Sequence, residues 1–161
     1  MPTRLLQPQG AFAPAPLLRR LAAAGYDLLL CLAILIVTAF IYKLIWMAFV
    51  GQARLRQLSD SGAMDGDPVL STLLLLAAFA FYGGFWTRSG QTLGMQAWGV
   101  RVQNTDGSAI SLTQALLRFM VAIASALCFG AGFFWSLYDR QGRTWHDRYS
   151  NSVLVRLPAR G

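Results

Sequence analysis

The chain has 161 residues, of which 55% are hydrophobic and 13% are charged, and its formal net charge is +7. Soluble domains carry about 25% charged residues, so this composition excludes an ordinary soluble domain and indicates one integral membrane domain. The bases, nearly all arginines, flank apolar segments, and no nucleic-acid-binding motif is present. We therefore expect a lipid bilayer with anionic headgroups, and no nucleic acid, as the partner of the positive charge.

The N-terminal part of the chain divides into a tail and a first membrane segment. Residues 1–16 contain four of the six prolines and few large apolar residues, which predicts a flexible, extended tail. A membrane domain over residues 17–157 follows, with a short tail at 158–161. Its first segment, residues 21–48, is longer than the roughly 7–15 apolar residues of a signal peptide core, so we expect it to remain in the mature protein.

Two further membrane segments are predicted. A polar loop at residues 51–67, with a short interfacial helix near 53–58, leads to Asp67-Pro68, which is a typical helix start. The second segment, residues 69–86, would span about 27 Å. Ser111-Leu-Thr-Gln114 is a capping box and predicts the start of a third segment over residues 112–137.

Two stretches have the alternating pattern of short strands, residues 98–103 and 152–157. A lone strand is not stable, so we expect the two to pair. The predicted fold class is an all-α integral membrane protein with two full transmembrane helices, a third membrane segment that is re-entrant or spanning, and a small cytoplasmic two-stranded β element.

The distribution of bases bears on the third segment. If it spans, six bases lie on one side and seven on the other, which sets no orientation under the positive-inside rule. If it re-enters by turning at residues 130–132, eleven bases lie on the cytoplasmic side against two outside, and both strands share one side. The uninterrupted apolar run 119–137 favours a full span. We favour the re-entrant form from the base count.

Asp27 is the single carboxylate inside the first apolar run. It lies seven residues after Arg20, on the same helix face and about 10 Å deeper. Intramembrane carboxylates usually mark proton or cation pathways, whereas the structural alternative is an ion pair that fixes helix packing. Arg118, two turns into the third segment, is the better direct partner for Asp27. A protonated Asp27 bound to Tyr82 or to a backbone carbonyl is the other possibility.

A polar cluster follows the third segment, and it contains the only histidine, His146, with Asp139, Asp147 and three arginines. We expect Asp147 to face Arg20, with His146 beside it. One histidine without a nearby cysteine is a weak metal or acid–base signal, and an ion-paired interfacial cluster is the simpler interpretation. No nucleophile elbow, phosphate loop or zinc spacing occurs, so we predict no enzyme activity, no metal and no cofactor.

The order of these features resembles the RDD family of bacterial membrane proteins. The resemblance covers residues 17–157 and rests on RRLAAAGYDLLL, FWTRSGQTLGMQAWGVRV, DGSAISLTQALLRF and GAGFFWSLYDRQGRTWHDRYSNS. The family name refers to one arginine and two aspartates. By position Arg20 is the arginine, Asp27 the first aspartate and Asp147 the second, with Asp139 as the rival. Relatives are expected to carry a proline before Gly130, where this chain has none.

The resemblance implies a multi-pass protein of the bacterial inner membrane and suggests transport. We expect either transport of an ion or small solute with Asp27 as the titrating group, or a scaffold in which the Arg/Asp residues only hold helices and partners. A cation site needs several oxygen ligands, and the second and third segments hold no carboxylate. Cation transport would therefore imply a homo-oligomer or backbone carbonyls.

Overall fold

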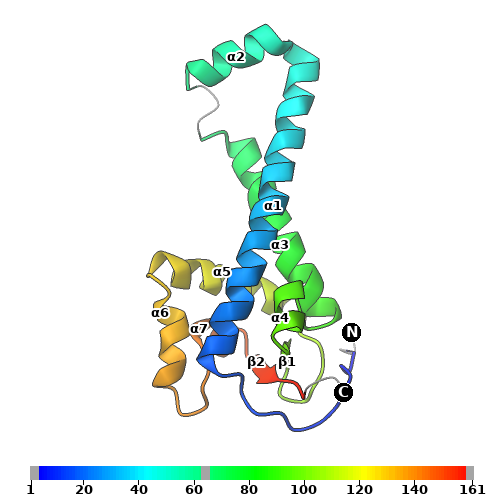
Figure 1. Ribbon diagram of the computed structural model, residues 1–161, viewed down its shortest axis with the longest axis vertical. Helices are drawn as coiled ribbons and strands as arrows, with labels where there is room; N and C mark the ends of the chain where they lie inside the picture. Colours follow the sequence, from blue (N-terminus) through cyan, green and yellow to red (C-terminus); the bar gives the residue numbers. More distant parts are fainter. Residues whose placement is uncertain (1–3, 63–65, 159–161) are drawn as a thin grey trace. The chain divides into compact units, whose positions relative to one another are not determined.

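The computed structural model describes residues 4–62 and 66–158 and is mostly helical (Figure 1). The two longest helices are α1 (Leu17–Val50) and α3 (Pro68–Arg88), and both are apolar and long enough to cross a membrane. They confirm the first two predicted segments. The 34 residues of α1 measure about 51 Å, which exceeds the roughly 30 Å of a hydrocarbon core.

The chain forms two compact units, one of which is Leu29–Ala80. This unit contains α2 (Gln52–Asp60), the short helix expected in the polar loop, while residues 63–65 of that loop lie outside the described residues. The hydroxyl of Tyr42 donates a hydrogen bond to Asp67. The other oxygen of Asp67 accepts a 2.8 Å bond from the amide of Val69, so Asp67 caps α3 as its sequence position predicts.

The second unit comprises the chain up to Leu28 and from Phe81 onward. It contains α4 (Leu93–Ala97), β1 (Val100–Gln103), α5 (Leu112–Leu127), α6 (Ala131–Phe134), the 3-10 helix η1 (Trp135–Leu137), α7 (Trp145–Tyr149) and β2 (Val153–Arg156). The strands pair antiparallel, with Val100 opposite Arg156 and Gln103 opposite Val153. The predicted two-stranded element is confirmed.

The third membrane segment is bent. The Ser111 side chain accepts a 3.2 Å bond from the amide of Gln114, and the Gln114 side chain accepts a 2.9 Å bond from the amide of Ser111, so the predicted capping box begins α5. The axis then turns by 108° between α5 and the α6–η1 stretch. Phe129 and Gly130 have φ angles of 53° and 79°, and these left-handed residues end the helix without a proline.

The N-terminal segment makes specific hydrogen bonds over its described residues, 4–16. The Ala15 amide donates to the Leu154 carbonyl and the Arg156 amide donates to the Ala13 carbonyl, both at 2.9 Å. Near its start, the carbonyls of Gln7 and Pro8 accept bonds of 2.8 and 3.0 Å from the buried Arg101 side chain. Proline lacks an amide donor but keeps its carbonyl, so a proline-rich chain can still satisfy a buried arginine. The predicted C-terminal tail lies outside the described residues from position 159 onward.

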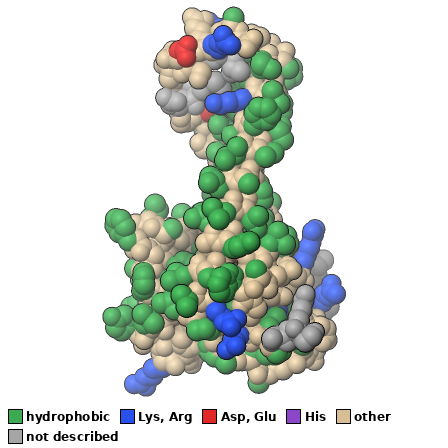
Figure 2. Space-filling view, viewed as in Figure 1, with side chains coloured by type: hydrophobic (Ala, Val, Ile, Leu, Met, Phe, Trp, Pro, Cys, Tyr) green, Lys and Arg blue, Asp and Glu red, His purple; other side chains and the backbone are tan. Residues whose placement is uncertain are grey.

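Large apolar side chains remain exposed along the helices. Figure 2 shows hydrophobic side chains over much of the visible surface of the helices. In α1, Leu28, Leu29 and Leu32 are more than half exposed. Soluble monomers rarely expose contiguous apolar patches of this kind. The exposed surface of α1 is therefore suited to lipid, and the protein is a membrane protein.

Candidate functional site

Asp147 joins two arginines that are distant in sequence. One of its carboxylate oxygens accepts a 2.6 Å hydrogen bond from Arg118 of α5, and the other accepts one from Arg20 of α1. The three side chains, here called the Arg/Asp cluster, are at most 2% exposed. Two guanidinium groups thus share one carboxylate in a buried site, which leaves one positive charge without a carboxylate partner within the cluster.

The local sequence positions each member of the cluster. Asp147 is the third residue of α7, where its carboxylate also accepts a 3.2 Å bond from the amide of Thr144 in a capping box. Arg118 donates a second bond, of 2.9 Å, to Ser152 just before β2. The cluster therefore ties α5, α7 and the entry to the sheet together.

Arg20 has a wide set of acceptors. In addition to Asp147, its guanidinium donates to the carbonyls of Ala15 at 2.7 Å, Gly142 at 3.0 Å and Leu154 at 3.3 Å. These carbonyls belong to the N-terminal segment, the loop before α7, and β2. Since Arg20 lies in the first turn of α1, it anchors the start of the first helix to three segments of the same unit.

The cluster controls two ionisation equilibria. Burial raises the pKa of Asp147, but the positive charges of Arg118 and Arg20 outweigh burial and hold the pKa below its ordinary value. Burial lowers the pKa of His146 to about 3, and the charge of Arg118 contributes further. At neutral pH Asp147 is therefore ionised and His146 is neutral, so the histidine adds no charge to the cluster.

Asp27 lies outside the Arg/Asp cluster, so the predicted direct pair with Arg118 is wrong. Its side chain is 1% exposed, and its two oxygens accept hydrogen bonds from the Thr92 hydroxyl and, at 2.8 Å, from the Gly94 amide. Thr92 is the N-cap of α4, so Asp27 binds the amide end of that helix, where a negative charge is favoured. The Thr92 hydroxyl and the Gly94 amide thus take the place of the arginine that the sequence suggested.

Asp139, the rival for the second aspartate, is in a different pair. Its carboxylate accepts a 3.2 Å bond from Arg143, four residues later. The hydrogen bonds from Arg143 hold the pKa of Asp139 below its ordinary value. The structure thus brings together Arg20, Arg118, Asp147 and the neighbouring His146, and it separates Asp27 and Asp139 from the ion pairs of the cluster.

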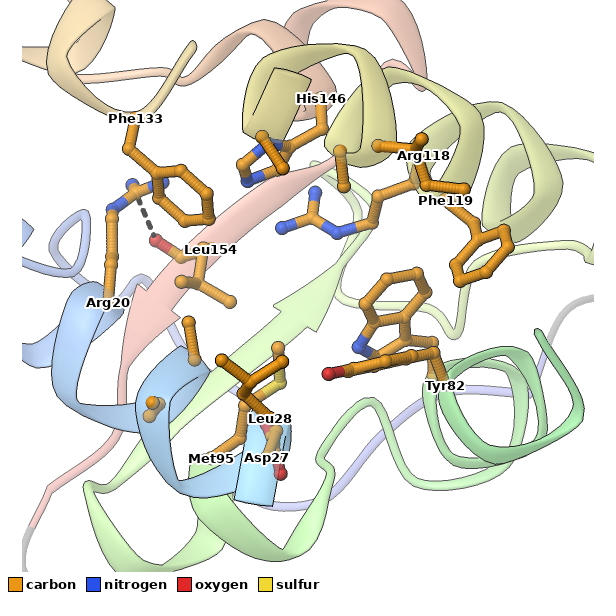
Figure 3. A pocket seen from close by; sticks show the side chains of 17 residues that line it. Arg20, Asp27, Leu28, Tyr82, Met95, Arg118, Phe119, Phe133, His146 and Leu154 are labelled. Atoms are coloured by element: carbon orange, nitrogen blue, oxygen red, sulfur yellow. Dashed lines mark hydrogen bonds between the residues drawn. The ribbon is translucent and has the colours of Figure 1, made fainter. Parts of the chain in front are cut away.

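A pocket of about 400 Å³ lies beside the cluster (Figure 3). Arg118 and His146 reach into it from one side, and Asp27 and Met95 lie on the opposite side in this view. Most of the remaining lining is apolar and comes from α1, α3, α5, α6 and β2: Ala23, Ala24, Gly25, Leu28, Tyr82, Trp86, Phe119, Ala122, Ile123, Ala126, Phe133 and Leu154. The pocket can therefore hold one small, largely apolar molecule.

Sequence reasoning missed three residues that shape this site. Thr92 was not singled out from the sequence, although its position before a short helix is an N-cap signal. Trp86, at the end of the second predicted segment, carried no sign of its contact with Arg118, whose guanidinium carbon is 5.3 Å from the centre of the Trp86 ring. Ser152 carried no signal, because its hydrogen bond to Arg118 depends on a contact between residues 34 positions apart.

The comparison with known families identifies the family of the chain. The sequence matches the RDD family over residues 14–151, which include every residue of the Arg/Asp cluster and Asp27. No curated protein and no solved structure matches the chain. The match covers most of the 161 residues, and the chain therefore belongs to the RDD family.

Proposed function

We propose that this RDD protein is a multi-pass protein of the inner membrane that binds a small solute in the pocket beside the Arg/Asp cluster and carries it across the bilayer. The pocket itself is the observation that supports this function. It combines a mostly apolar lining with buried charged side chains, which is the usual composition of a small-molecule site.

The geometry supports a small solute over a bare cation. Both oxygens of Asp27 already accept hydrogen bonds within the protein, and a cation site needs several oxygens around one ion. Among residues 4–62 and 66–158, no three histidine, cysteine or acidic side chains are grouped closely enough to hold a metal ion. A titrating role for Asp27 would have to operate through its contact with α4.

The base count supports the orientation. With the sheet on the cytoplasmic side and the bent α5–α6 segment returning to that side, eleven bases lie in the cytoplasm and two outside. In this arrangement anionic lipid headgroups face the arginines near the sheet. We propose the re-entrant form of the third segment on this basis.

A scaffold function is the second candidate, and one observation favours it. Arg20 and Arg118 make their hydrogen bonds with groups of the protein itself: Asp147, Ser152 and backbone carbonyls. Residues used in this way hold segments together whether or not a solute binds. The two candidates predict different results in a transport assay.

The test is flux into proteoliposomes, measured for Na⁺, K⁺, H⁺ and a panel of radiolabelled small solutes. Ala122 lines the pocket, whereas Ala124 on the same helix is exposed and is not part of the lining. We expect solute uptake by the wild type and by Ala124→Phe, and little uptake by Ala122→Phe. Ion flux that disappears in Asp27→Asn would assign transport to the carboxylate. No flux of any ion or solute would favour the scaffold.

A further inference from the structure

We infer that the ligand of this pocket is an anionic amphiphile, with an acidic head group beside Arg118, Trp86 and His146 and an apolar body along α5. This inference rests on the proposed binding role of the pocket and names the chemical class that the site selects. Carboxylate and phosphate heads share the relevant chemistry, because each is a negatively charged hydrogen-bond acceptor.

Unsatisfied polar atoms mark the head-group end of the pocket. Among the described residues, four buried side-chain atoms have no hydrogen-bond partner. Ser125 Oγ lies outside the pocket lining, and the other three are Trp86 Nε1, Arg118 Nε and His146 Nδ1. All three residues line the pocket. An unpaired buried polar group costs about 1–3 kcal/mol, and native proteins rarely leave such groups without an explanation. A bound acceptor that reaches them would remove this cost.

The type of these atoms selects the ligand. An indole N–H and a guanidinium N–H can only donate, and a neutral imidazole nitrogen can donate or accept. A ligand that presents acceptors can satisfy all three groups, whereas an ammonium or another donor-only head cannot satisfy the first two. The pocket thus requires an acceptor at this end.

The charges around the pocket favour an anion. The Arg/Asp cluster carries two guanidinium groups and one carboxylate, and His146 is neutral at physiological pH because burial and the arginine charges lower its pKa. The carboxylate of Asp27 is bound to Thr92 and the amide of Gly94. The excess positive charge therefore lies at the end where the unpaired donors are found.

The remaining lining accommodates an apolar body. Ala122, Ile123 and Ala126 present a stripe of α5 to the pocket, and Phe119 and Phe133 add aromatic surface. The volume of about 400 Å³ is near the lower end of the range for small-molecule pockets. A single short chain or ring fits this space better than a two-chain lipid.

The experiment uses the full-length protein in phosphatidylcholine nanodiscs and a diazirine derivative of decanoic acid as a photo-crosslinking probe. Labelled residues are mapped by mass spectrometry in the presence of unlabelled decanoate, decanol or decyltrimethylammonium. We expect labels on α3 and α5 residues that line the pocket. Decanoate should suppress them at a concentration at least about tenfold lower than the other two, since a hydrogen bond to a charged group is the stronger kind.

Matched variants localise the binding. Ala122→Phe should abolish pocket labelling, and Ala124→Phe, on the exposed side of the same helix, should leave it unchanged. Ala126→Phe, at a more exposed lining position, provides a second pocket variant if Ala122→Phe fails to fold. Thermal melts establish that the variants compared are folded.

The outcomes separate this inference from the proposed function. If decanol or the quaternary amine competes as well as decanoate while Ala122→Phe still abolishes labelling, the pocket binds solutes but the anionic class is wrong. If labelling is insensitive to Ala122→Phe and Ala126→Phe, both proposals are wrong. Adding phosphatidylglycerol to the nanodiscs distinguishes the source: suppression of labelling assigns the anionic head to a membrane lipid, and no suppression assigns it to a free amphiphile.

Discussion

Arg118 lies 2.6 Å from one oxygen of Asp147, while the other oxygen of the same carboxylate accepts a hydrogen bond from Arg20. Because the carboxylate is shared, the three residues do not contribute equally to stability. Removing Asp147 leaves two buried guanidinium groups without a counter-charge, whereas removing Arg118 leaves the pair between Arg20 and Asp147 intact.

We therefore predict that Asp147→Asn lowers the free energy of unfolding by about 3–5 kcal/mol, the usual cost of breaking a buried ion pair. Arg118→Met should cost less, because it removes the unbalanced charge and keeps an apolar stem. Thermal or denaturant unfolding in detergent measures both losses. Equal losses for the two variants would show that the carboxylate is not shared in this way.

Double-mutant cycles distinguish the observed partners of Arg118 from the expected one. The losses in unfolding free energy caused by Arg118→Ala and by Asp27→Ala should add within about 0.5 kcal/mol, because the two side chains share no hydrogen-bonded partner. The losses of Arg118→Ala and Asp147→Ala should not add, since the second change removes an interaction already lost. A strong coupling of Arg118 to Asp27 would contradict the arrangement described here.

The contact of α4 with α1 depends on a glycine. A Cβ atom at Gly94 would lie 2.5 Å from the Ala23 carbonyl oxygen and 2.8 Å from an Asp27 oxygen, so Gly94→Ala must push α4 away from α1. We predict a loss of several kcal/mol in unfolding free energy, comparable to overpacking a core. Gly84→Ala in α3 is the control, because its Cβ would meet nothing within 4 Å, and it should be neutral or slightly stabilising.

Stability should fall as the pH falls below about 6.5. The pKa of His146 is about 3 in the folded protein and about 6.5 when exposed, so between these values the unfolded state binds the extra proton. The neutral, buried histidine makes its full contribution to the free energy of unfolding above about pH 6.5. About 2–3 kcal/mol of that free energy is lost by pH 4.5. The lowered pKa of Asp147 keeps that carboxylate ionised over the same window.

Replacing the histidine isolates this effect. His146→Phe has no titrating group and retains a flat ring against Phe133, whose ring centre lies 4.8 Å from that of His146. Melting temperatures at pH 7 and pH 4.5 should differ less in this variant than in the wild type. The same pH dependence in both proteins would assign the acid sensitivity to other groups.

The N-terminal segment should contribute to stability. Deleting residues 1–9 removes the carbonyls of Gln7 and Pro8 that accept bonds from Arg101, and it also removes Leu6, a buried apolar side chain that is 5% exposed. We predict a lower melting temperature, and limited proteolysis should cut slowly between residues 4 and 16 in the intact protein. A flexible tail would be cut rapidly, and its deletion would leave the melting temperature unchanged.

Cysteine labelling tests the proposed orientation. In a background with Cys31 and Cys128 replaced by alanine, Gln52→Cys in α2 should react with a membrane-impermeant maleimide added to intact spheroplasts. Gln141→Cys, in the exposed loop before α7, should react only after the membrane is opened. Reaction of Gln141→Cys from outside would show that the third segment spans the membrane.

The sequence by itself determined the local features of this protein. The length and apolarity of α1 and α3, the capping box at Ser111 and Gln114, and the alternation in the two strands depend on residues close together in the chain. Helix hydrogen bonds join residues close together in the chain, and the burial of apolar side chains follows from their number and spacing. These elements could therefore be placed without knowledge of the tertiary structure.

Only the tertiary structure decided which groups meet. Asp27 and Thr92 are 65 residues apart, and Arg20 and Asp147 are 127 apart, so no local pattern contains either pair. A buried carboxylate needs donors, but a guanidinium, a hydroxyl and a helix amide can each supply them, and depth estimates alone pointed to Arg118 for Asp27. The packing of α4 against α1 placed Thr92 and Gly94 closer, and the capping geometry of α7 held Asp147 between the two arginines.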